Sequence, residues 1–235
     1  MTNLRALHFY STPEHDCSYL EGRHAKTLFV DPQAIIATDT YSQLSDLGFR
    51  RSGKHIYRPH CDNCQACISI RIPVDRFSMT KSQKRVVSRN RDLKVNVKEP
   101  YFSDRHYDLY SRYINARHSD GDMHPPTEDQ FCSFLIDGNQ NSLFYEFWDQ
   151  DQLVAVAVTD QLESGLSAIY TFFDPALTKR SLGTYAILYQ IAEARDLNLD
   201  YIYLGYWVRD CRKMNYKISY RPLEMLLDGH WVLLK

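Results

Sequence analysis

The stretch IYTFFDPALTKRSLGTY, residues 169–185, reads as a strand, a break and the start of a helix. Residues 169–173 are β-branched and aromatic, which is typical of a strand, and Asp174-Pro175 ends it. Apolar residues from Leu182 onward follow the spacing of a helix. A strand-to-helix connection of this kind places side chains beside a helix N-terminus. The free N–H groups and the dipole of that terminus favour an anionic partner. We therefore expect a ligand site within this stretch.

The loop in this stretch resembles the acyl-CoA loop of the GNAT acyltransferases, Arg/Gln-x-x-Gly-x-Gly/Ala, through Arg180 and Gly183. Tyr185 stands where those enzymes have a second small residue, and its ring would crowd a pyrophosphate that approached the backbone amides. This difference argues against CoA as the donor. An ordinary joint between a strand and a helix is the alternative explanation of the same residues.

The chain around the joint predicts an α+β fold with a mixed sheet. Three apolar strands joined by short turns predict an antiparallel meander, over residues 143–148, 153–159 and 167–173. A helix over 182–195 and a strand over 201–207 follow. Because such crossovers are right-handed, residues 169–173 and 201–207 should be parallel neighbours whose splayed ends flank the site. Asp228-Gly229 between apolar runs predicts a final hairpin.

Composition limits the possible partners. The chain of 235 residues carries 28 basic and 29 acidic residues, for a net charge of −1. No global field attracts nucleic acid, so any such contact needs a local basic patch. The N-terminus has no signal-like pattern and no segment is apolar enough for a membrane span, so we expect a cytoplasmic protein.

Three cysteines with the spacing C-x2-C-x2-C, Cys61, Cys64 and Cys67, are close enough to hold one soft metal ion or cluster. Cys17 is our first choice as the fourth ligand, ahead of His60 and His15. Small buried thiols in a tight loop are the alternative. We expect an N-terminal cysteine-containing subdomain over residues 1–78, in which Thr38 or Asp39 caps a short helix that Gly48 ends.

A basic helix follows, within a linker over residues 79–100. Thr80 and Gln83 form a capping-box pattern. Most of the helix cations recur at steps of three and four residues, which predicts a phosphate-binding face; the candidates are Lys81, Lys84, Arg85, Arg89 and Arg91. A solvated helix face is the alternative.

Residues 208–222 combine cations with tyrosines just after the strand that borders the loop. Cations bind phosphates or carboxylates, and aromatic rings stack bases or line an acyl pocket. The candidates are Arg209, Lys213, Lys217, Tyr220 and Arg221. A solvated strand edge is the alternative.

Seven ordered segments resemble bacterial members of the arginyl/leucyl-tRNA–protein transferase family. They are CSYLEGR, YSQLSDLGFRRSGKHIYRPHC with the two further cysteines, SIRIPV, IYTFFDP, SLGTYAILYQI, YLGYWV and KMNYKISYRPLE. The similarity covers residues 17–224. It implies a GNAT-like catalytic domain, here 101–235, that uses aminoacyl-tRNA in place of acyl-CoA to extend a protein N-terminus and mark it for degradation.

The resemblance also implies partners: aminoacyl-tRNA for the basic helix and acceptor proteins with N-terminal Asp or Glu, with no DNA or membrane. Eukaryotic members carry a C-x2-C pair where this chain has Cys17 and Leu20. That difference leaves zinc, an iron–sulfur cluster or no metal open, and the transfer chemistry itself needs no cofactor.

Roles in the implied transfer can be assigned as hypotheses. Asp174 would orient or deprotonate the acceptor amine, and Tyr170 or Tyr206 would deliver a proton to the leaving 3′ oxygen. Gly183 and the amides near Tyr185 would face the terminal adenosine of the donor. The carboxylate of the acceptor would bind the cations of 208–222, namely Arg209, Lys213, Lys217 and Arg221.

Aromatic residues near the loop, with few acids, favour leucine over arginine as the transferred residue. The alternatives are an arginyl transferase of the same family, an acetyl-CoA-dependent GNAT enzyme, a non-catalytic RNA-binding module and a metal-dependent regulator.

Overall fold

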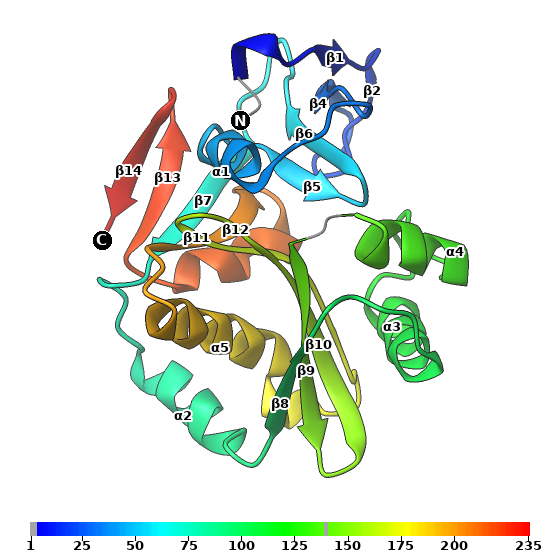
Figure 1. Ribbon diagram of the computed structural model, residues 1–235, viewed down its shortest axis with the longest axis vertical. Coiled ribbons are helices and arrows are strands. Elements are labelled where there is room, and N and C mark those ends of the chain that lie inside the picture. Colours follow the sequence, from blue (N-terminus) through cyan, green and yellow to red (C-terminus); the bar gives the residue numbers. More distant parts are fainter. Residues whose placement is uncertain (1–3, 139–140) are drawn as a thin grey trace.

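An eight-stranded mixed sheet forms the centre of the protein (Figure 1). The computed structural model describes residues 4–138 and 141–235. The strand order is β14-β13-β7-β12-β11-β10-β9-β8. The strands are β7 (Ile68–Pro73), β8 (Lys94–Lys98), β9 (Ser142–Asp149), β10 (Gln152–Gln161), β11 (Gly165–Phe173), β12 (Tyr201–Trp207), β13 (Leu223–Leu227) and β14 (His230–Leu234).

The pairing follows from the sequence pattern. Short turns make β9, β10 and β11 an antiparallel meander, whereas the crossover through α5 (Leu182–Asp196) makes β11 and β12 parallel. Asp228 and Gly229, both with positive φ, form the turn of the β13–β14 hairpin. The predicted α+β class, with a mixed sheet flanked by helices, is confirmed.

Helices cover both faces of this sheet, as Figure 1 shows. On one face α5 packs on β10, β11 and β12, and α2 (Lys81–Arg89) packs on α5. On the other face α3 (Asp104–Arg117) packs on β10 and β11 and contacts α4 (Glu128–Phe131). A single π-helical turn, η2 (Cys132–Ile136), follows α4. Each face therefore has its own apolar core.

The cap predicted for α2 is present, and α4 also begins with a side-chain cap. Thr80 and Gln83 form the full capping box of α2, and the Thr127 side chain accepts the Gln130 N–H at the start of α4. The expectation for the first helix was wrong in one respect. The N-cap of α1 (Thr38–Asp46) is Ala37, which has no capping side chain, so Thr38 and Asp39 lie inside the helix.

The N-terminal region forms a smaller four-stranded sheet in the order β1-β4-β6-β5, with α1 against it. Its elements, with the isolated β2–β3 pair and the first 3-10 turn, are η1 (Leu4–Ala6), β1 (Phe9–Ser11), β2 (His15–Asp16), β3 (His24–Ala25), β4 (Thr27–Val30), β5 (Arg50–Ser52) and β6 (His55–Pro59). β7 leaves this region and enters the large sheet between β12 and β13. The division of the chain at residues 78 and 100 stays a prediction.

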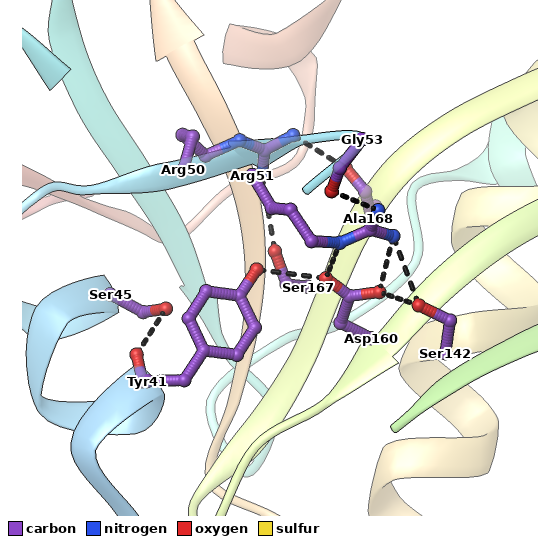
Figure 2. Close-up of polar contacts among 9 residues, drawn as sticks. All are labelled: Tyr41, Ser45, Arg50, Arg51, Gly53, Ser142, Asp160, Ser167 and Ala168. Atoms are coloured by element: carbon purple, nitrogen blue, oxygen red, sulfur yellow. Dashed lines mark hydrogen bonds and ion pairs between the residues drawn. The ribbon is translucent and has the colours of Figure 1, made fainter. Parts of the chain in front are cut away.

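A buried ionic network joins the small sheet to the large one (Figure 2). Arg51 of β5 makes a bidentate ion pair with Asp160 of β10, at 2.7 and 2.8 Å. Tyr41 of α1 and Ser142 of β9 donate to the same carboxylate at 2.8 and 2.5 Å. Because Arg51 and Asp160 are 3% and 0% exposed, this pairing fixes the position of β5 on the sheet.

None of the helices that the structure describes has the length and apolar character needed to cross a membrane.

Candidate functional site

The candidate site lies where β11 and β12 part. These strands pair only from Gly165 to Ser167 against Tyr201 to Tyr203, and the rest of each strand diverges. Two 3-10 turns lie at the ends of the diverging strands: η3 (Thr178–Arg180) after β11 and η4 (Arg212–Ser219) after β12. The predicted splay of the two strands is therefore present.

Arg50 of β5 fills the start of this gap (Figure 2). Its guanidinium donates to the Ala168 carbonyl at 2.8 Å and to Ser167 Oγ at 3.3 Å, both on β11. On the β12 side it lies against Gly205, where an added Cβ would come within 2.6 Å of Arg50 Cζ. Gly205 also has a φ of +74°, so glycine is needed there for conformation and for space.

Lys217 of η4 lies on the β12 side of the gap. Its Nζ donates to the Tyr206 carbonyl at 2.6 Å. Burial, and then the nearby Arg50 guanidinium, lower the pKa of Lys217 from 10.5 to about 7. Two cations thus bracket the point of divergence.

Asp174, at the end of β11, is held by neighbouring groups. Its Oδ2 accepts from Arg112 Nη1 at 2.9 Å and from Gln152 Nε2 at 3.5 Å, and its Oδ1 accepts the Ala176 N–H at 2.9 Å. The carboxylate is only 5% exposed and orders the turn that leaves the strand. Its assignment as the residue that orients or deprotonates the acceptor amine stays a prediction.

The two candidate tyrosines differ in their surroundings. Tyr206 donates to the Gly48 carbonyl at 2.8 Å and contacts the Tyr57 carbonyl at 3.3 Å. The Tyr170 hydroxyl is buried and has no hydrogen-bond partner among the described residues. Burial, with the nearby Tyr113 and Tyr110 phenols, raises the pKa of Tyr170. A protonated phenol without a partner is a free hydrogen-bond donor.

The loop before α5 is already occupied by protein side chains. Arg180 pairs with Asp92 at 2.9 and 3.0 Å and with Asp149 at 2.7 Å. Tyr185 is buried, with its ring centroid 5.5 Å from that of Phe147. Gly183 allows α5 to approach β11, because an added Cβ would lie 3.0 Å from the Phe173 ring. Tyr185 therefore belongs to the helix–sheet packing.

The other predicted residues of 208–222 do not converge with Lys217. Lys213 pairs with Asp120 at 2.8 Å, and Arg221 donates to the Ile218 and Lys235 carbonyls at 3.2 and 2.6 Å. Arg209 is exposed. Tyr220 is 1% exposed and is part of the apolar core around α5.

The predicted phosphate-binding face of α2 lies on the surface. Val86 is buried against the core and Val87 is half-buried, so the cations point to the other side. All five are exposed: Lys81, Lys84, Arg85, Arg89 and Arg91. Arg89 also donates to the Lys179 carbonyl, which links α2 to the loop before α5.

The four candidate metal ligands line one cavity of about 750 Å³ in the N-terminal region: Cys17, Cys61, Cys64 and Cys67. Burial, followed by the nearby Cys17, Cys61 and Cys64, raises the pKa of the Cys67 thiol to about 12. In the described ranges no three His, Cys, Asp or Glu side chains are arranged to hold a metal ion. The assignment of these thiols as metal ligands stays a prediction.

Two sequence profiles of one family match consecutive parts of this chain. "Arginine-tRNA-protein transferase, N terminus" matches residues 15–85, and "Arginine-tRNA-protein transferase, C terminus" matches residues 105–227. The chain belongs to the arginine-tRNA-protein transferase family. The family predicted from the sequence is therefore confirmed, and with it an aminoacyl-tRNA-dependent transferase.

Close relatives of this transferase span its full length. The aspartate/glutamate leucyltransferase of Hahella chejuensis is 56% identical over 99% of both chains. The protein of the same name from Pseudomonas fluorescens Pf0-1 is 54% identical over 100% of both. Among solved structures, L-PGS from Bacillus licheniformis gives a TM-score of 0.46 at 11% identity, over 61% of this chain and 47% of that one.

Sequence reasoning missed Arg50 as a residue of this transferase's candidate site. Arg50 and Arg51 are consecutive on β5. Arg50 donates to the Ala168 carbonyl on β11, whereas Arg51 pairs with Asp160. No signal in the sequence separated Arg50 from the exposed arginines, because its partners on β11 lie far away along the chain.

Proposed function

We propose that this protein moves leucine from leucyl-tRNA onto the α-amine of polypeptides that begin with Asp or Glu. The observation that carries the proposal is the 56% identity, over 99% of both chains, to a relative named aspartate/glutamate leucyltransferase. The reaction draws on charged tRNA, so we place it in the cytoplasm. The product would be a polypeptide marked for degradation by its new N-terminal leucine.

The loop before α5 supports a donor other than CoA. A pyrophosphate needs free backbone amides and a free cation at a helix N-terminus. Here Arg180 is neutralised by Asp92 and Asp149, and the Tyr185 ring is buried beside the loop. The terminal adenosine of a tRNA, which has no pyrophosphate, is the donor group that we assign to this end of the gap, near Gly183.

Leucine rather than arginine fits the aromatic surface beside the diverging strands. Tyr113 of α3 lies 4.8 Å from Phe173 and 6.2 Å from Tyr170 between ring centroids, which makes an apolar surface. An arginyl side chain would need a free carboxylate. The nearby acids Asp174 and Asp120 are already paired, with Arg112 and Lys213.

The transfer replaces an ester with an amide. The acceptor nitrogen bonds to the leucyl carbonyl carbon, the bond from that carbon to the ribose 3′ oxygen breaks, and the amine proton ends on that oxygen. We assign Tyr170 to donate a hydrogen bond to the reacting oxygen, because its phenol is protonated and unpartnered. An α-amine has a pKa near ~8, so positioning supplies much of the rate.

The exposed cations of α2 are our proposed contact for the tRNA backbone. The net charge of −1 gives the protein no overall attraction for a polyanion. A local row of cations on a helix supplies that attraction, and it makes the binding dependent on salt.

We propose that this chemistry needs no cofactor, because it involves no redox change. A structural zinc ion or iron–sulfur cluster at Cys17, Cys61, Cys64 and Cys67 is a separate prediction, and no step above depends on it. Elemental analysis of the purified protein, with transfer assayed after chelation, tests both statements. Loss of transfer with the fold intact would contradict the first.

Transfer of labelled amino acids tests the function directly. Leucyl-tRNA and arginyl-tRNA are offered in parallel, with peptides that differ only in an N-terminal Asp, Glu, Lys or Ala. We expect leucine to appear on the Asp and Glu peptides alone. Arginine transfer instead would keep the family and overturn the proposed donor, and acetyl transfer from acetyl-CoA would overturn the tRNA donor.

A further inference from the structure

We propose that Arg50 and Lys217 together bind the side-chain carboxylate of the acceptor's N-terminal Asp or Glu. This inference rests on the transfer proposed above and names the groups that select its acceptor. It adds Arg50 to the site, and it retains Lys217 alone among the cations first considered in residues 208–222.

The two cations lie at one point of the fold. Arg50 bonds to Ser167 and Ala168 on β11 and lies against Gly205 of β12. Lys217 bonds to the carbonyl of the next β12 residue, Tyr206. Both positive groups are therefore held where the two strands diverge, beside the aromatic surface assigned to the leucyl group.

Neither cation has a counter-ion within the part of the chain that the structure describes. The ion pairs among residues 4–138 and 141–235 include neither Arg50 nor Lys217, although both side chains are half-buried. Two other cations of the same region are paired, since Arg112 holds Asp174 and Lys213 holds Asp120. A half-buried cation without a paired anion is costly, so a bound anion would stabilise this arrangement.

Both groups retain hydrogen-bonding capacity for a ligand. A guanidinium carries more N–H donors than the two hydrogen bonds of Arg50 use, and the ammonium of Lys217 carries more than its one hydrogen bond uses. A carboxylate can accept from both cations at once.

A single carboxylate fits this place better than a tRNA phosphate. The exposed row of cations on α2 suits the extended backbone of a polyanion, whereas Arg50 and Lys217 are recessed between two strands. Tyr57 and Tyr206, with ring centroids 6.3 Å apart, lie beside them and limit the room. An acidic side chain next to the reacting amine meets both conditions.

The titration of Lys217 gives this site a signature. Arg50 of β5 and Cys211 of the loop after β12 are the charged and titratable groups that act on Lys217, and burial lowers its pKa to about 7. A bound carboxylate favours the charged form, so at pH 8 binding should draw a proton onto Lys217. Binding of a ligand with an amide in place of the carboxylate should not change the protonation of Lys217.

Peptides that begin with Asp or Asn and are otherwise identical test the proposal on the full-length protein. With Lys217→Met we expect kcat/KM on the Asp peptide to fall by about 100-fold. The loss should appear mainly in KM, and the preference for Asp over Asn should largely disappear. Arg212→Met, an exposed cation on the same η4 turn, is the matched control and should keep both values.

Calorimetry on the unmodified protein provides a second test that needs no variant to fold. At pH 8, in buffers of different ionisation enthalpy, binding of the Asp peptide should be accompanied by more proton uptake than binding of the Asn peptide. Both share the α-amine, so the difference isolates the side chain. Equal binding and equal proton uptake would overturn the proposal.

The outcomes separate this inference from the proposed function. If Lys217→Met keeps the wild-type preference for Asp over Asn, the inference is wrong while leucyl transfer stands. If the wild-type protein transfers no leucine but binds Asp peptides selectively with proton uptake, the carboxylate site stands and the proposed function is wrong.

Discussion

The fold partly desolvates the ammonium group of Lys217 and also holds it in place as a hydrogen-bond donor. Its bond to the Tyr206 carbonyl orients the ammonium, while Arg50 opposes its charge. Such an arrangement destabilises the free protein, and a bound anion would offset that cost.

The pH dependence of stability should reveal this cost. The folded pKa of Lys217 is about 7, below its ordinary value of 10.5. Between these values the unfolded chain binds more protons than the folded one, so this residue makes stability rise with pH. Below about pH 7 both states are protonated and its cost is largest.

We therefore expect Lys217→Met to be more stable than the wild type at pH 6.5, by about 0.5–3 kcal/mol. The difference should shrink as the pH rises toward ~10, near the unfolded pKa of lysine. Urea unfolding at several pH values measures it. A difference that does not change with pH would contradict the low folded pKa.

Tyr170 offers a second test at a single atom. Tyr170→Phe removes only the hydroxyl, which has no protein partner among the described residues, so the fold should keep its stability. We expect kcat to fall by about 10²-fold if the phenol donates to the reacting oxygen. Single-turnover transfer from leucyl-tRNA measures this. Unchanged transfer would remove Tyr170 from the chemistry.

At the scale of single elements, α2 has a clear division between an apolar face and a charged face. Its apolar side packs on α5, its capping box fixes its start, and its cations face solvent. The Arg89 contact with the Lys179 carbonyl connects this helix to the loop before α5. A tRNA bound along α2 would thus lie beside that loop.

Replacing Lys81, Lys84 and Arg85 with glutamine should weaken leucyl-tRNA binding without unfolding α2. We expect the slope of log affinity against log salt to fall by about 0.7–0.9 for each phosphate that the variant no longer neutralises. Filter binding over a range of salt concentrations measures it, with Arg212→Gln as the control. An unchanged slope would show that the tRNA backbone lies elsewhere.

At the scale of the whole molecule, the junction between the four-stranded and the eight-stranded sheet determines where Arg50 lies. Arg50 reaches the candidate site only because β5 is held against the large sheet, and the neighbouring Arg51–Asp160 pair holds it there (Figure 2). The proposed role of Arg50 in acceptor selection therefore links that selection to the integrity of the N-terminal region through one strand.

Asp160→Asn should cost about 3–5 kcal/mol of unfolding free energy, because it leaves the Arg51 charge buried without its partner. Ser142→Ala, which removes a hydroxyl from the same network but no charge, should cost about 1 kcal/mol. Denaturant unfolding compares the two. A decrease of less than about 1 kcal/mol for Asp160→Asn would show that the pair contributes little to the junction.

The sequence alone was sufficient for the strands of the meander, the capping box of α2 and the parallel crossover, and its ordered segments were sufficient for the family. Caps, periodicity and turns depend on residues a few positions apart, so they can be read without a structure. Thr80 with Gln83 and the Asp228-Gly229 turn are examples.

The candidate site depended on contacts between distant residues. Arg50 lies 118 residues before the Ala168 carbonyl that it binds, and Lys213 lies 93 residues after its partner Asp120. Charge and spacing could not show which cations are neutralised, because neutralisation requires a partner brought near by folding. Among the described residues, only the tertiary structure distinguished Lys217 and Arg50, half-buried and without an ion-pair partner, from the paired or exposed cations around them.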